Sequence, residues 1–165
     1  MTSAMLVHFG ALAEAATGEG LACCVFVRDL IRRWSRRPLT TQGALWCIWP
    51  DSDGTVPPSR VWGPVDAAIS EGVAEARAES PGYRWTIAQG WRGLLPDGTA
   101  DPAEGSQGHT FLVRALGGPE EWVLIAESDE RNGPRVRVAR WSSVKRSWPS
   151  GIALAVLIRP ADEVD

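Results

Sequence analysis

The order of the expected elements predicts an α+β fold, with helices in the first part of the chain and an antiparallel sheet in the last third. Two observations carry this prediction: apolar residues at helical spacing near the N-terminus, and short apolar segments separated by glycine- and proline-rich turns near the C-terminus. The chain has 165 residues, 44% of them hydrophobic, which suits one domain with a sizeable core. We therefore expect residues 1–165 to form a single domain.

Two amphipathic helices are expected to open the fold. Residues 3–16 and 21–36 have helical spacing, and Gly18 and Gly20 break the chain between them. The second helix should present one apolar face, formed by Val27, Leu30, Ile31 and Trp34.

The middle of the chain, about 38–100, is expected to be an irregular and helical insertion rich in tryptophan. The stretch 38–64 is rich in Pro, Gly, Ser and Thr, and Pro64 suits the first turn of a helix that runs to about Ala78. The region holds five of the nine tryptophans, Trp46, Trp49, Trp62, Trp85 and Trp91. Exposed indoles would suit a carbohydrate or peptide groove, but the chain has only three Phe and one Tyr, so we favour a role in the core.

Four strands are expected after a surface loop at 95–108. They are 109–116, 122–127, 135–141 and 151–158. Glycine and proline mark the turns between the first three, which suits hairpins.

Charge and hydropathy exclude several classes of partner. The net charge is -3 and the isoelectric point about 5.4, so nucleic acid is not an expected partner. No stretch reaches the roughly 18 consecutive apolar residues of a membrane span. The N-terminus carries no ordinary signal peptide, and three cysteines make no disulfide framework. We expect cytoplasmic synthesis, and export would need a non-classical route.

A cysteine at a helix start is the main functional candidate. Cys23 begins the second predicted helix, where the helix dipole favours a thiolate. On that helix Cys23 should share the apolar stripe, while Cys24 should point towards the Arg28 side. A single cysteine is often a buried, inert residue, and that interpretation stays open. His109, which follows a glycine at the start of a predicted strand, could act as its base.

Carboxylates at the end of the next strand could complete a triad. If the two strands pair, Glu127 or Asp129 would lie near the His109 end of the neighbouring strand and could orient the imidazole. Alternatively, both carboxylates are solvated turn residues.

These residues resemble the motifs of a known superfamily. The string Cys23-Cys-Val-Phe-Val27 is similar to the nucleophile signature of NlpC-like papain-fold peptidases, and Gly108-His109-Thr-Phe-Leu-Val113 resembles their glycine-histidine strand and that of CHAP amidases. Glu127-Ser-Asp129 stands where CHAP-like sequences have a Glu-x-Asn element. The resemblance implies a papain-like fold with N-terminal helices packed on the sheet, Cys23 as nucleophile, His109 as base and Glu127 as third member. It also implies a bacterial cell-wall peptide or amide as substrate.

Supporting roles and alternatives remain. Asp129 could assist Glu127, and Gln89 is a candidate oxyanion donor by residue type, or with Tyr83 a residue of the cleft. No cofactor is expected, and the spacing of the cysteines and histidines does not suit zinc. The same fold could serve as a non-catalytic module that binds a ligand, a protein partner or a carrier, and the same triad could transfer an acyl group to an amine.

Overall fold

The fold is built on one antiparallel sheet of six strands in the order β1-β6-β2-β3-β4-β5. The strands are β1 (Ala74–Ala78), β2 (Thr86–Trp91), β3 (Gly108–Gly117), β4 (Trp122–Asp129), β5 (Gly133–Arg140) and β6 (Ile152–Leu157). The computed structural model describes residues 23–35, 56–100, 108–119, 121–129 and 133–158. The expected helix at 3–16, Trp46, Trp49 and half of the expected 95–108 loop, residues 101–107, lie outside these residues.

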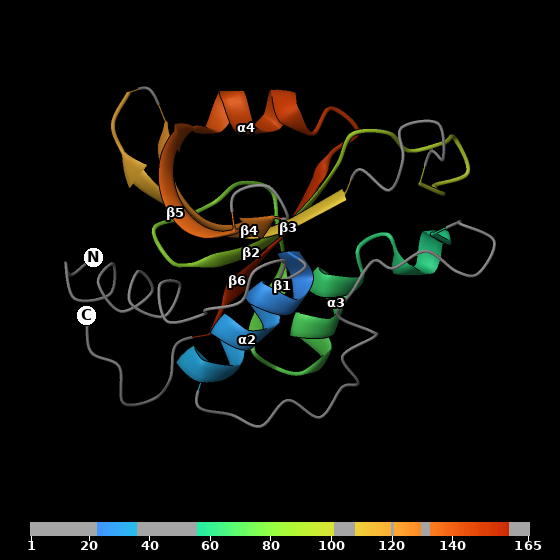
Figure 1. The fold of residues 1–165 in the computed structure, drawn as a ribbon, viewed down its shortest axis with the longest axis horizontal. Helices are drawn as coiled ribbons and strands as arrows, with labels where there is room; N and C mark the ends of the chain where they lie inside the picture. The colour runs from blue at the N-terminus through green and yellow to red at the C-terminus, as the bar shows by residue number, and fades with distance from the viewer. Residues whose placement is uncertain (1–22, 36–55, 101–107, 120, 130–132, 159–165) are drawn as a thin grey trace.

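Helices cover both faces of the sheet. The described α-helices are α2 (Cys23–Ser35), α3 (Gly63–Ser70) and α4 (Trp141–Ser147), and a short 3-10 helix, η2, spans Pro58–Arg60. Figure 1 shows α4 above the sheet and α2 and α3 below it. The α+β prediction is therefore confirmed. No helix in the described part of the chain is long and apolar enough to cross a bilayer.

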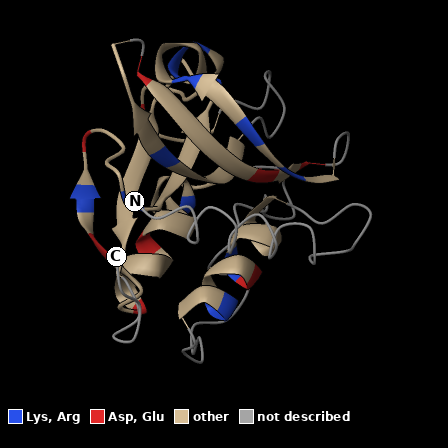
Figure 2. Cartoon of the chain, turned by 90° about the vertical axis from the view of Figure 1, so that its left-hand side faces the viewer, with Lys and Arg blue, Asp and Glu red and all other residues tan. Residues whose placement is uncertain are grey.

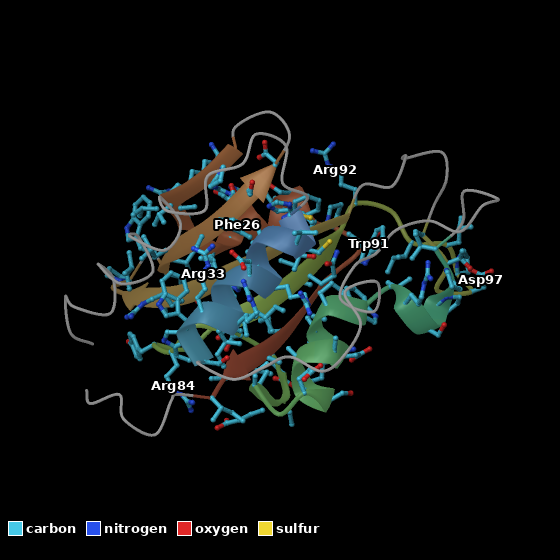
Figure 3. The ribbon with its side chains drawn as sticks, turned by 60° about the horizontal axis from the view of Figure 1, so that its bottom comes forward. Phe26, Arg33, Arg84, Trp91, Arg92 and Asp97 are labelled. Carbon is cyan, nitrogen blue, oxygen red and sulfur yellow. The ribbon has the colours of Figure 1, made fainter. Side chains whose placement is uncertain are left out.

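The apolar face predicted for the second helix is confirmed. Its four predicted residues are all buried in α2, together with Phe26, and pack against the sheet. Figure 3 shows Phe26 on this helix and Arg33 near its last turn, where Arg33 pairs with Asp29. Figure 2 shows both acidic and basic positions on this helix. The sequence placed Cys23 on the apolar stripe of this helix and Cys24 off it. In the structure Cys24 is the buried cysteine, while Cys23 is partly exposed.

The helix predicted from Pro64 to about Ala78 is wrong in its second half. The helix α3 ends at Ser70, and Gly72 has a φ of 74°, which favours glycine and ends the helical path. Residues 74–78 then form the edge strand β1, paired with β6. The short polar sequence of this strand suits an edge.

The expected insertion at 38–100 supplies two strands of the sheet. Besides β1, the strand β2 lies between β6 and β3 and is buried along its whole length. Trp85 and Trp91 are each 1% exposed, as expected for tryptophans of the core. The strand predicted at 135–141 ends at Arg140, because Trp141 begins α4 and joins the core on that face.

Candidate active site

The first residue of α2 meets the start of β3. The pairing of β3 with β4 begins at Leu112 and Ala126, so the first residues of β3 extend past it. There the backbone N–H of Thr110 donates a hydrogen bond to Sγ of Cys23, over 3.4 Å. The thiol therefore binds β3 at the point where this strand is no longer paired with β4.

His109 lies on the face of the sheet that α4 covers. Phe111 is two residues further along β3 and packs in the core cluster that includes α4, and its ring stacks on His109 with centroids 5.5 Å apart. Trp148, just after α4, also stacks on His109 at 5.5 Å. A methyl group on Gly90 would lie 2.5 Å from Cγ of Trp148, so glycine is needed there for the indole to fit. The His109 side chain is 12% exposed and is held between two aromatic rings.

Glu127 is the carboxylate that reaches the imidazole. Its Oε1 atom lies 3.4 Å from Nε2 of His109, which leaves Nδ1 as the ring nitrogen available to the thiol. The Glu127 side chain is only 3% exposed, but two arginines of β5 compensate its charge. Arg135 Nη2 lies 2.9 Å from Oε2, and Arg137 Nε donates to the same oxygen over 3.0 Å. A buried carboxylate with three cationic partners is fixed in place.

The thiol and the imidazole form an ion pair. A hydrogen bond from Cys24 is the largest influence on Cys23, and with the hydrogen bond and charge of His109 it outweighs burial and lowers the pKa of Cys23 to about 4. Burial disfavours the charged imidazole, but hydrogen bonds to Cys23 and Glu127 raise the pKa of His109 to about 9. Near pH 7 the pair is therefore a thiolate and an imidazolium.

Glu127 is ionised over the same range of pH. Burial works against its charge, but hydrogen bonds from His109 and Arg137 lower the pKa of Glu127 to about 2. The site thus contains a thiolate, an imidazolium and a carboxylate. These are the groups that a catalytic triad uses as nucleophile, base and orienting carboxylate.

Gln89 has a different position from the one expected of an oxyanion donor. It is fully buried in β2, and its Nε2 donates to the carbonyl of Gly90 over 3.0 Å. Its Oε1 accepts a short hydrogen bond from the hydroxyl of Thr110, the residue opposite it on β3. Gln89 therefore supports Thr110, whose backbone in turn binds Cys23.

The other two expected site residues lie elsewhere. Asp129 ends β4 opposite Gly133, two residues beyond the carboxylate that contacts His109. Tyr83 lies before β2 and is 65% exposed, next to a cavity at the opposite end of β3. It does not line the cysteine site.

Sequence reasoning missed the roles of Arg135, Arg137 and Trp148. The arginines alternate along β5, which is the signal for side chains on one face of a strand, but their partner becomes visible only with the register that places Arg135 opposite Glu127. Trp148 carries no signal in the sequence, because its contact with His109 depends on the packing of α4.

Within the described ranges, no group of three or more His, Cys, Asp or Glu is arranged to hold a metal ion. Comparison with known proteins gave no match to a family model, a curated protein or a solved structure.

Proposed function

We propose that the protein is a cysteine hydrolase that cleaves a peptide or amide bond, with Cys23 as nucleophile, His109 as general acid and base, and Glu127 as the orienting carboxylate. The observation that carries the proposal is the hydrogen-bonded chain from the thiol through the imidazole to the buried carboxylate. A structural cysteine has no need of such a chain, because a neutral buried thiol is stable without a charged partner.

The proposed reaction has two steps. The Cys23 thiolate attacks the carbonyl carbon of the amide, the C–N bond breaks, and the His109 imidazolium gives its proton to the leaving amine. Water then attacks the thioester while His109 takes a proton from it, which releases the carboxylic acid and restores the thiolate. The sum is amide plus water to acid plus amine.

The oxyanion of each step would be stabilised by the start of α2. The first N–H groups of a helix have no partner within the helix, and the first turn of α2 carries no acidic side chain that would oppose a negative charge. We assign this role to the backbone N–H of Cys23 and a neighbouring group of the first turn, and no longer to Gln89.

The fold and substrate class are proposed on the resemblance to NlpC-like and CHAP-like enzymes. A helix that begins with the nucleophile and packs on an antiparallel sheet that begins with the base is compatible with a papain-like arrangement. The substrate proposed on this basis is a peptide or amide bond of the bacterial cell wall.

Mass spectrometry of the quenched enzyme tests this proposal. We expect muropeptide fragments to give an acyl adduct on the peptide that contains Cys23, followed by turnover. Cys23→Ala should abolish both, whereas Cys24→Ser, which keeps a hydrogen-bond donor beside Cys23, should retain both. Turnover that persists in Cys23→Ala would contradict the proposal, and conjugates formed with added amines would identify a transferase instead.

A further inference from the structure

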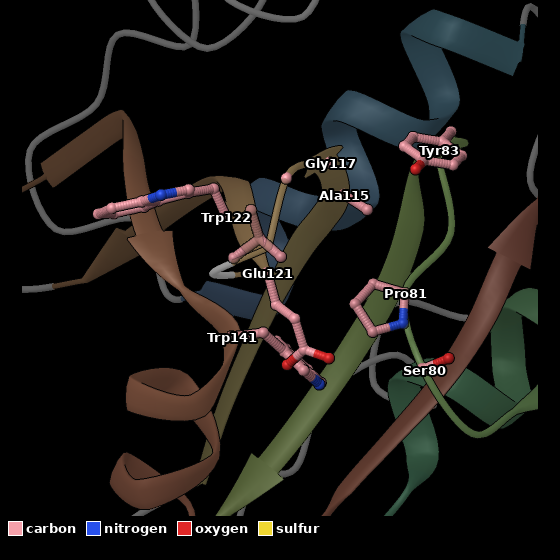
Figure 4. Close-up of a pocket in the computed structure, with 10 residues that line it drawn as sticks. Ser80, Pro81, Tyr83, Ala115, Gly117, Glu121, Trp122 and Trp141 are labelled. Carbon is pink, nitrogen blue, oxygen red and sulfur yellow. The ribbon is translucent and has the colours of Figure 1, made fainter.

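A cavity lies at the opposite end of β3 from His109. It has a volume of about 210 Å³ and its lining includes Tyr83, Gly117, Glu121, Trp122 and Trp141 (Figure 4). Ala115, at the edge of the cavity, lies six positions after His109 along β3, which corresponds to about 20 Å along an extended strand. The cavity is therefore separate from the cysteine site.

The walls of the cavity are fixed by backbone contacts. The N–H of Ala115 donates to the carbonyl of Gly82 over 2.7 Å, which holds the segment before Tyr83 against β3. A methyl group built on Gly117 would lie 3.6 Å from the Tyr83 ring, so this ring lies against Gly117 although it is 65% exposed. A large aromatic ring that is both exposed and positioned is available to a ligand.

Glu121 supplies a hydrogen-bond acceptor to the same cavity. Its φ is 52°, the one positive value of a non-glycine residue within the described parts of the chain, and its carbonyl accepts the N–H of Trp141 over 2.9 Å. Figure 4 shows its carboxylate pointing towards Trp141 and Pro81. The backbone is thus held in a costly conformation that directs this side chain to the cavity.

The charge around the cavity favours a neutral ligand. The guanidinium of Arg140 lies 5.2 Å from the ring centroid of Trp122, so one face of that indole already has a cation. Glu121 brings one negative charge and Arg140 one positive charge to the neighbourhood of Trp122, so these two charges together select neither a cationic nor an anionic ligand. Aromatic rings with a carboxylate and the Ser80 hydroxyl suit a ligand with C–H faces and hydroxyl groups.

We propose that this cavity binds one ring of a neutral pyranose sugar. Its volume lies below the roughly 300 Å³ at which pockets for drug-sized ligands begin, which suits a single ring. Tyr83 stacks on the sugar face, and the Glu121 carboxylate and the Ser80 hydroxyl bind sugar hydroxyls. The proposal does not depend on the function of Cys23.

Titration of the full chain with methyl β-D-glucopyranoside, methyl β-D-galactopyranoside and N-acetylglucosamine, followed by NMR, tests it. We expect at least one sugar to cause saturable shifts of the Gly117 and Gly118 amides and the Trp122 indole. Tyr83→Ala should weaken binding at least tenfold, Tyr83→Phe should retain it because the ring remains, and Glu121→Gln should weaken it. Cys23→Ala should bind as the wild type does, which separates this test from that of the hydrolase.

Three results would overturn the proposal. They are the absence of saturable shifts with all three sugars, binding that Tyr83→Ala leaves unchanged, and saturation of the same signals by choline, which would identify a site for a cation instead.

Discussion

The backbone nitrogen of Thr110 lies 3.4 Å from Sγ of Cys23, so the nucleophile candidate is bound directly by the strand that carries its base. His109 is the preceding residue of that strand. The side chains of Cys23 and His109 are thereby aligned by one hydrogen bond from the backbone of β3 to the thiol. A change in the docking of α2 on the sheet would move the thiol and the imidazole apart.

The fit of Trp148 over Gly90 gives a first prediction. In Gly90→Ala the added methyl group would meet the indole at 2.5 Å, so Trp148 must move away from His109. We expect a loss of about 1–3 kcal/mol in the free energy of unfolding, the usual cost of overpacking, and a change in tryptophan fluorescence. Urea denaturation measures the loss. Gly82→Ala, where the methyl group would meet nothing within 4 Å, is the matched control and should change little; equal losses in both variants would refute the explanation.

The charge of Glu127 gives a second prediction, on stability. Glu127→Gln leaves Arg135 and Arg137 without their carboxylate, and we expect a loss of about 1–2 kcal/mol in the free energy of unfolding at pH 7. The figure is low because the side chains of Arg135 and Arg137 are 40% and 39% exposed to screening solvent. Urea denaturation of the wild type, of this variant and of the exposed control Glu79→Gln would measure it.

The pH dependence of that loss has a defined sign. The pKa of Glu127 is lowered from an ordinary 4.5 to about 2, so its stabilising contribution is present above about pH 4.5 and disappears as the pH falls towards 2. The difference between the wild type and Glu127→Gln should therefore shrink on acidification. A difference that stays constant between pH 7 and pH 2.5 would show that Glu127 does not titrate as described.

The buried pair of Gln89 and Thr110 gives a third prediction. Thr110→Val leaves Oε1 of Gln89 without its donor in a fully buried position, which we expect to cost about 1–3 kcal/mol. Gln89→Met should cost a similar amount, while the double variant should cost less than the sum of the two by about 1 kcal/mol, because they lose the same bond. Additive losses in a double-mutant cycle would contradict the coupling.

The helix α2 and the strands β3 and β4 could be predicted because their apolar residues follow a helical or strand pattern. The strand β2 could not, since both of its faces are buried and its sequence therefore has no alternation of polar and apolar residues. β1 was missed because its Ala- and Glu-rich sequence is equally compatible with a helix and only its pairing with β6 decides.

The candidate site could be predicted as a set of residues but not as a geometry. Cys23 and His109 were found because each begins an element, whereas the choice of Glu127 over Asp129 depends on how β3 and β4 separate beyond Leu112. A sequence also cannot show that Cys24 donates a hydrogen bond to its neighbour. Such contacts depend on side-chain conformations that only the folded structure fixes.

The pH dependence of Cys23 alkylation by iodoacetamide, followed by mass spectrometry of the Cys23 peptide, tests the central claim most directly. The ion pair predicts that the alkylation rate of the wild type rises with pH around a midpoint near pH 4. His109→Ala should raise that midpoint by several units towards the ordinary cysteine pKa of about 8.5. His8→Ala, at the other histidine of the chain, should leave the midpoint unchanged. The midpoint is compared, and not the rate alone, because a thiolate of low pKa is also a weaker nucleophile. A wild-type midpoint at pH 8 or above, or one that His109→Ala does not move, would contradict the account.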